Sequence, residues 1–349
     1  MARSIPQPSI LIDYELQPRP FSLAESQESY FWVNQTIEFP GRRYLKGKLA
    51  YLESQEAERE LEILKLSIAY QVKEAFFNLL LAEEQLKYSL ENLEIAQKFK
   101  EMVELKYSAG EISQAEVLRA KVELSRAVNL ARSAETQRNI AKARLNIILG
   151  RKSNEVIEIQ GELKQKNLDL SFDEAYKLAL SLRPELKKLE YSLLKTKTMK
   201  SQAYLSYFPD FNLGLSRHKV SGEKFWDFNL SFTVPLFFWQ TKRGEIAEAE
   251  ALYRALEKEK AYWQNIISLE LEEAYQNVLL AQEQIQIYEK DMLSQSQEVY
   301  DMFLLSFKEG QIGGLDLIEA RRTWIETKMS YAETLYQHAV ALASLERVL

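Results

Sequence analysis

The sequence predicts a mainly helical fold with a small β part, built from two copies of one unit. The first observation is an internal repeat, because residues 74–86 read EAFFNLLLAEEQL and residues 273–285 read EAYQNVLLAQEQI. The second observation is that each segment leads to a glycine-centred turn, YSAGEIS at 107–113 and FKEGQIG at 307–313, followed by another helical segment. Two copies of a long-helix unit largely determine the architecture before any motif is considered.

The composition excludes several classes of protein. Of the 349 residues, 46% are hydrophobic and 28% are charged, which excludes a disordered chain. The net charge of −6 is mild, and no basic block or interleaving of Lys/Arg with aromatics indicates a nucleic-acid partner. The absence of cysteine excludes disulfides, thiolate metal sites and cysteine nucleophiles. No apolar run reaches the roughly eighteen residues of a membrane-spanning helix.

The first copy is predicted to span residues 1–150. Period-two alternation predicts its strands, the second of which ends at Pro40, and apolar residues at three- and four-residue steps predict its helices. Ser113 is a suitable N-cap for the shorter helix, and Gly150 is suited to follow its last turn. The predicted elements are strands at about 8–16 and 31–39, a long helix at about 41–107 and a helix at about 113–149.

A polar connector at 151–171 leads to the second copy, which is predicted to span 172–349. Ser171 caps its first helix, which is interrupted at Pro184, and its second strand ends at Pro235. The predicted elements are a helix at about 172–207, strands at about 209–217 and 226–234, a long helix at about 242–307 and a helix at about 313–348. The first copy has no counterpart of the opening helix.

The strands allow two interpretations. Alternation over nine to eleven residues with aromatics near the ends is typical of outer-membrane barrel strands, and residues 226–234 show it well. An ordinary sandwich strand with one buried face gives the same alternation and is its more frequent origin. However, four strands cannot close a barrel, and two isolated hairpins have nowhere to bury an apolar face. A trimer that pools twelve strands would resolve both problems.

The repeat resembles the TolC family of outer-membrane efflux proteins over nearly the whole chain. The matching pieces are the two repeated helices, the two glycine turns, the proline-ended strands, LNIILG at 145–150 and RPEL at 183–186. Residues 35–50 and 234–251 look most like the heavy-metal cation efflux branch of that family.

This resemblance implies a homotrimer whose twelve strands form an outer-membrane β-barrel, surrounded by outer-membrane lipid and continued by a periplasmic α-helical barrel. It implies a passive exit duct for a tripartite efflux or type I secretion system, with no catalytic chemistry and no cofactor. A periplasmic adaptor would link the duct to an inner-membrane pump. The expected location is therefore the cell outer membrane, with most of the chain in the periplasm.

The resemblance places an acidic ring at the periplasmic entrance of the duct. Asp316 and Glu319 are three residues apart and so lie on one helix face, where three chains would supply six carboxylates. Such a ring attracts cations and repels anions. Glu116 occupies the matching place in the first copy beside Arg119, so its ring would be electrically mixed. The alternative is an ordinary solvated helix face.

The two glycine turns are expected to dock the adaptor. The residues of this predicted contact are Gly110, Glu111, Ile112, Ser113, Gly310, Gln311, Ile312 and Gly313. Trp32, Trp226 and Trp239 lie near predicted strand ends, where they are expected to form an interfacial aromatic girdle. His218 and His338 are isolated from each other in sequence, so no metal site is predicted.

The rival class is a soluble coiled-coil scaffold or interaction protein without transport activity, which explains the long helices but not the strand pairs. No phosphate loop, histidine cluster or nucleophile motif indicates an enzyme. Residues 1–20 lack the apolar core of a signal peptide. We hypothesise that Met1 is not the native start and that a signal peptide and a helix precede it; an in-frame stop codon immediately upstream would refute this. The sequence does not identify the cargo.

Overall fold

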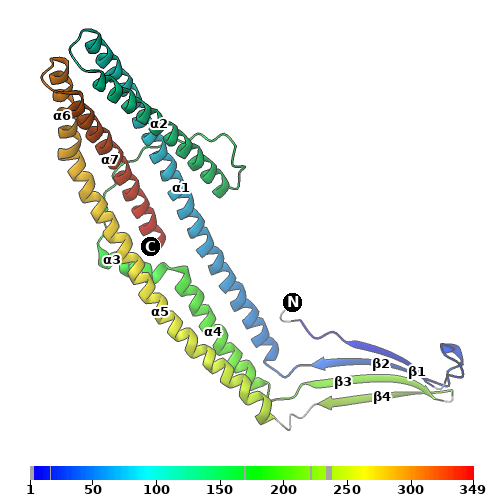
Figure 1. Cartoon of the computed structure of the whole chain (residues 1–349). Coiled ribbons are helices and arrows are strands. Elements are labelled where there is room, and N and C mark those ends of the chain that lie inside the picture. Colours follow the sequence, from blue (N-terminus) through cyan, green and yellow to red (C-terminus); the bar gives the residue numbers. More distant parts are fainter. Residues whose placement is uncertain (1–3, 16, 169, 221, 233–237) are drawn as a thin grey trace. The chain divides into compact units, whose positions relative to one another are not determined.

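The computed structural model describes residues 4–15, 17–168, 170–220, 222–232 and 238–349, without the side chains of 238–242 (Figure 1). The chain divides into two compact units, and each takes segments from both predicted repeats. The first unit comprises Met1–Glu62 and Pro184–Gln264, and the second comprises Ile63–Arg183 and Asn265–Leu349. The division of the sequence into repeats therefore does not coincide with the compact units and stays a prediction.

The first unit contains one antiparallel sheet of four strands in the order β1-β2-β3-β4. The strands are β1 (Ser9–Glu15), β2 (Glu28–Ile37), β3 (Phe211–Val220) and β4 (Glu223–Phe232), and a 3-10 turn (Leu23–Glu25) lies between the first two. The pairing of β2 with β3 joins the two strand pairs into a single sheet, from Glu28 opposite Val220 to Ile37 opposite Phe211. The predicted end of the fourth strand at 234, and Pro235 after it, lie outside the described residues.

The two faces of the sheet differ in polarity. Residues opposite each other on paired antiparallel strands lie on the same face. One face carries Ile10, Ile12, Phe31, Val33, Leu213, Leu215, Trp226, Phe228 and Leu230. The other carries Asn34, Thr36, Asn212, Gly214, Ser216, Asp227, Asn229 and Ser231. The apolar face is not buried within the chain, since Trp226 is 65% exposed and Phe228 is 71% exposed.

Asp210 fixes the junction between strands and helices in this unit. The N–H of Phe39 donates to its Oδ1 at 2.7 Å, and Nη1 of Arg42 donates to its Oδ2 at 2.5 Å. Arg42 also donates to the carbonyl of Leu205, through Nη2 at 3.1 Å. Phe39 stacks on Phe208 with ring centroids 4.5 Å apart. The start of the first long helix is thereby tied to the segment that leads into β3.

The helices follow the predicted pattern, with one long helix subdivided. They are α1 (Arg42–Ser108), α2 (Gln114–Ile148), α3 (Phe172–Leu182), α4 (Pro184–Leu205), α5 (Phe238–Ile287), the π-helix η2 (Tyr288–Met292), α6 (Leu293–Lys308) and α7 (Gly314–Val348). The helix expected at 172–207 is two helices because a proline opens α4 and disfavours helical geometry at the preceding residue. A capping box between Ser171 and Glu174 begins α3. No helix in the described part of the chain is long and apolar enough to cross a membrane.

The core of the second unit lies where the two helical hairpins end (Figure 1). One cluster joins α1 and α2 with α6 and α7, and Ile112 and Ile312 from the two turns pack against it. Its buried members are Phe99, Val103, Val117, Ala120, Tyr300, Phe307, Leu317 and Ile318. A second cluster joins α1 to α2 further along, around the fully buried Leu79. Both hairpin ends therefore rest on one shared core.

The π-helix marks a one-residue difference between the two copies. Segments 74–86 and 273–285 are 199 positions apart, whereas Gly110 and Gly310 are 200 positions apart. The second copy thus holds one more residue between its repeated helix and its turn. The π-helix lies within that interval, and α1 is an uninterrupted α-helix over the matching stretch. A single π turn accommodates an extra residue without shifting the faces of the helix on either side.

Candidate functional site

Both hairpin turns have the same backbone structure. The N–H of Gly110 donates to the carbonyl of Tyr107 at 3.0 Å, and the N–H of Glu111 donates to that of Lys106 at 2.9 Å. Gly310 and Gln311 repeat this pattern on α6 at 3.1 and 2.9 Å. This is a Schellman motif, which places its central residue at positive φ. Both glycines have such φ values, 77° and 76°, so the conformation rather than a lack of space requires glycine.

The turn residues differ in how accessible they are. Glu111, Ser113, Gln311 and Gly313 are exposed. Ile112 and Ile312 are half-buried, and their side chains pack against the shared core. The polar turn residues are therefore accessible at the surface, where Glu111 pairs with Lys106 at 3.0 Å, whereas the two isoleucines anchor the turns to the core.

Asp316 and Glu319 lie on one face of the first turns of α7, and both are exposed. They line a groove of about 490 Å³ together with Gln295 and Ser296 of α6. Neither carboxylate forms an ion pair with a residue that the structure describes. The groove therefore presents two uncompensated negative charges beside neutral polar groups.

Glu116 has a different environment from this acidic pair. One of its carboxylate oxygens accepts from Arg119 at 3.0 Å, as the spacing of the two residues suggests. The other oxygen is buried against the start of α7, where a Cβ on Gly314 would come within 2.7 Å of it. Glu116 is therefore a contact between α2 and α7, with its charge already balanced by the arginine.

A buried charge cluster, which was not predicted from the sequence, joins the same two helices. Glu123 accepts from Arg126 at 2.7 Å, from Arg321 at 3.1 Å and from Arg322 at 3.5 Å. The side chains of Glu123 and Arg321 are only 10% and 6% exposed. A signal was available, because Glu123 follows Val117 and Ala120 along the apolar seam of α2. A charge at a seam position indicates a charged partner on the facing helix.

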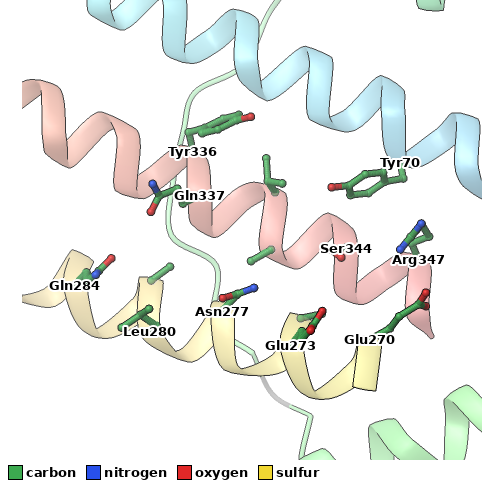
Figure 2. A pocket seen from close by; sticks show the side chains of 14 residues that line it. Tyr70, Glu270, Glu273, Asn277, Leu280, Gln284, Tyr336, Gln337, Ser344 and Arg347 are labelled. Atoms are coloured by element: carbon green, nitrogen blue, oxygen red, sulfur yellow. The ribbon is translucent and has the colours of Figure 1, made fainter. Parts of the chain in front are cut away.

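A cavity of about 370 Å³ with a mixed polar and apolar lining lies elsewhere in the second unit, among α1, α5 and α7. Figure 2 shows Glu270, Asn277 and Gln284 on one side of it, at seven-residue steps along α5. Arg347 of α7 lies on the other side, 5.2 Å from the centre of the Tyr70 ring. Burial raises the pKa of the Tyr70 hydroxyl above its ordinary value. The seven-residue spacing was the sequence signal for this polar row.

The predicted aromatic girdle is divided between the two faces of the sheet. Trp226 lies on the exposed apolar face, opposite Arg217. Trp32 pairs with Ser216 and so lies on the polar face. The side chain of Trp239 lies outside the described residues. Trp226 and Trp32 therefore lie on opposite faces of the sheet, and the girdle stays a prediction.

The two histidines lie in different surroundings. Nδ1 of His218 lies 2.8 Å from the Asp227 carboxylate on the polar face of the sheet, and its ring stacks on that of Tyr30. His338 is fully buried in α7, and burial lowers its pKa. Among the described residues no group of three or more His, Cys, Asp or Glu side chains could hold a metal ion.

Comparisons with known proteins agree with this arrangement. A family model described as "Outer membrane efflux protein" matches residues 33–151 and 175–349, which include both hairpins, strands β3 and β4, and the second half of β2. The cobalt-zinc-cadmium resistance protein CzcC of Cupriavidus metallidurans is 24% identical, over all of this chain and 82% of that protein.

Solved structures share the fold at low sequence identity. A membrane protein from Pseudomonas aeruginosa superposes with a TM-score of 0.85 at 16% identity, covering 99% of this chain and 85% of that one. The outer membrane protein VceC of Vibrio cholerae superposes with a TM-score of 0.83 at 15% identity, covering 99% and 87%. Because the family model matches well over half of the chain, including both hairpins, the chain belongs to the outer membrane efflux protein family.

Proposed function

We propose that three copies of this chain form a passive exit duct for substrates that an inner-membrane pump delivers through a periplasmic adaptor. The observation that carries this proposal is the family match, which spans both helical hairpins and most of the sheet. Members of this family are outer-membrane channels rather than enzymes, and we propose no catalytic role for this chain. The helical part lies in the periplasm, and the sheet is the part in the outer membrane.

The polarity of the sheet supports its place in lipid. The apolar face is exposed in the single chain and includes Trp226 and Phe228. In the pooled twelve-stranded barrel this face contacts the lipid, and the face with Asn34 and Asn229 lines a wet interior. Trp226 then serves as an interfacial aromatic. A soluble scaffold would leave the same apolar face in water, which makes that alternative unfavourable.

We further propose that the hairpin turns dock the adaptor. Glu111, Ser113, Gln311 and Gly313 are the exposed residues that would make the contact, and Ile112 and Ile312 hold the turns in place. The identical backbone at Gly110 and Gly310 gives the two hairpins ends of the same shape. Their side chains differ, so any adaptor meets two related surfaces rather than one.

The cargo that we propose is a metal cation. Asp316 and Glu319 form an uncompensated acidic pair at the hairpin end, and three copies would concentrate cations at the entrance. Glu116 belongs to the same region but is neutralised by Arg119, so it contributes little to this field. The resistance function named for CzcC, against cobalt, zinc and cadmium, supports this class of cargo.

Single-channel conductance in a planar bilayer tests the duct and its entrance together. Asp316→Asn combined with Glu319→Gln should reduce the preference for cations without closing the channel. The matched control is Glu298→Gln with Asp301→Asn, an exposed acidic pair at the same spacing on α6. If the preference for cations changes equally in the test pair and in the control pair, or in neither, the acidic entrance is refuted. A protein that never forms a conducting trimer would refute the duct.

A further inference from the structure

The charged residues of the sheet are segregated between its two faces. The lysine and arginine residues of the four strands are Arg217, Lys219 and Lys224, and the register puts all of them on the apolar face. The acidic residues of the strands all lie on the polar face, and they are Asp13, Glu15, Glu28, Glu223 and Asp227. Within the four described strands, no carboxylate therefore shares a face with the cations.

The three basic residues form one patch on β3 and β4, here called the cationic patch. Lys219 lies directly opposite Lys224, and Arg217 lies opposite Trp226 at the next level of the same face. The Arg217 guanidinium lies 5.7 Å from the centre of the Trp226 ring. The cationic side chains are exposed, and none forms an ion pair with a described residue. Like charges directly opposite each other destabilise an antiparallel pair, so an anion between the two lysines would stabilise the hairpin.

The cationic patch lies at the end of the sheet away from the helices of the first unit. Strand β2 ends at Ile37 before α1 begins, and β3 begins at Phe211 after α4, so these paired residues mark the helical end. The patch adjoins the opposite end, where Val220 pairs with Glu223. Because the helical part is periplasmic, this far end of the sheet reaches the outer leaflet of the outer membrane.

The apolar face continues directly into the cationic patch. Leu215 and Phe228 lie opposite each other at the level next to Arg217 and Trp226, and both are exposed. A lipid whose acyl chains cover Leu215 and Phe228 brings its headgroup to the level of the cations. Long basic side chains and tryptophan are suited to this boundary, because each joins an apolar body to a polar end.

We propose that the cationic patch binds the headgroup of an outer-leaflet lipid that carries two phosphate monoesters. One phosphate lies between Lys219 and Lys224 and relieves their repulsion, and Arg217 donates to the other. Two monoesters carry a charge of about −3 to −4, which matches three uncompensated cations better than the single charge of a phosphodiester. This inference rests on the proposed place of the sheet in the outer membrane.

Other occupants satisfy only part of the cationic patch. A neutral or zwitterionic lipid covers the apolar face but leaves the three positive charges uncompensated. An acidic protein would have to displace lipid from Leu215 and Phe228. A neighbouring copy of this chain that paired its β1 with β4 would supply no carboxylate, because the residues of β1 on this face are Ile10, Ile12 and Tyr14.

Native mass spectrometry of the delipidated full-length trimer tests the proposal by counting bound lipid. The probe is lipid A, an acylated disaccharide with two phosphate monoesters, and its control is the same lipid after removal of both phosphates. We expect up to three lipid A molecules per trimer and at least tenfold weaker binding of the dephosphorylated lipid. Equal binding of the two would overturn the proposal, because the acyl chains alone would account for it. Competition by inorganic phosphate at equal concentration would also overturn it, because a free anion would then suffice.

Variants separate the cationic patch from general effects of charge. Lys219→Gln combined with Lys224→Gln should weaken the binding of lipid A at least tenfold. The matched control is Lys177→Gln with Lys258→Gln, which removes the same charge from exposed lysines of α3 and α5 and should leave binding unchanged. Lipid A should raise the thermal unfolding midpoint of the native trimer and of the control, but not that of the test variant.

The outcomes distinguish this inference from the proposed duct. Equal binding in the test and control variants, or an equal loss in both, would refute the cationic patch. A trimer that conducts but binds lipid A without regard to its phosphates would overturn this inference alone. A chain that never forms a conducting trimer would overturn the duct together with it.

Discussion

Removal of the Glu123 carboxylate should strongly destabilise the packing of α2 on α7. In Glu123→Leu, the guanidinium of Arg321 keeps its charge but loses the partner that Nη2 contacts at 3.1 Å. Its side chain is only 6% exposed, so water does not replace the lost acceptor. Leaving one member of a buried pair uncompensated costs about 3–5 kcal/mol of the free energy of unfolding.

The reverse change should cost less. In Arg321→Met, Glu123 still accepts from Arg126 at 2.7 Å and from Arg322 at 3.5 Å. The loss is then one charge-assisted hydrogen bond, about 1.5–3 kcal/mol, offset in part because two unpaired donors also disappear. The double variant should lie within about 1 kcal/mol of the native free energy of unfolding, since no buried charge is left without a partner.

Denaturant unfolding of the helical part, followed by circular dichroism, measures these differences as a double-mutant cycle. The control is Glu94→Leu, which breaks an ion pair with Lys98 whose side chains are 65% and 67% exposed. Breaking that exposed pair should have little effect on stability, because water and salt screen the interaction. A Glu123→Leu variant as stable as the control, or a double variant whose loss is the sum of the two single losses, would refute the reasoning.

Three further predictions follow from features of the helices. Gly310→Ala should cost about 1–2 kcal/mol in thermal unfolding, because its φ of 76° is unfavourable for alanine, and Gly310→Asn should cost clearly less; equal losses would refute this. Burial lowers the pKa of His338, so the folded protein holds this side chain neutral where the unfolded chain would protonate it. The free energy of unfolding should therefore fall below pH 6.5, by up to about 1.4 kcal/mol per pH unit. His338→Leu should flatten the pH profile of the unfolding midpoint, and an unchanged profile would contradict this role of His338. Deletion of Lys290 should preserve helicity and the yield of trimer, because it converts the π turn to an α turn. Deletion of Leu90 from the uninterrupted helix α1 should disrupt the hairpin end and lower the yield of trimer. Equal losses of trimer in the two variants would contradict the interpretation of the π turn as a one-residue insertion.

The sequence predicted the helices well because their signals are local. Ser171 and Pro184 each mark the start of a helix, because their own chemistry favours that position. The glycines of the two turns mark the ends of helices, because glycine readily adopts positive φ. The strands were less well placed. Strand β3 extends to Val220 and strand β4 begins at Glu223, so the hairpin is longer than the predicted strands at 209–217 and 226–234. The reason is that backbone pairing continues past the apolar pattern, for example where Lys219 lies opposite Lys224.

The candidate site was only partly predictable. Helical spacing predicts that Asp316 and Glu319 share one helix face, and in the structure both line the same groove. The contact of Glu116 with Gly314, and the pairing of Glu123 with Arg321, depend on which helices pack together. That information is not contained in the spacing along one helix. The π turn could have been found by comparing the two repeat spacings.

The outer strands of the sheet have a consequence for the unassembled subunit. Strands β1 and β4 each pair on one side among the described residues, and every residue in both strands is exposed. Open edges beside an apolar face are templates for non-specific strand addition and aggregation. In the trimer that we propose, pairing of neighbouring chains removes these edges, so assembly rather than folding protects the protein. Subunits produced faster than they assemble should therefore depend on chaperones or be degraded.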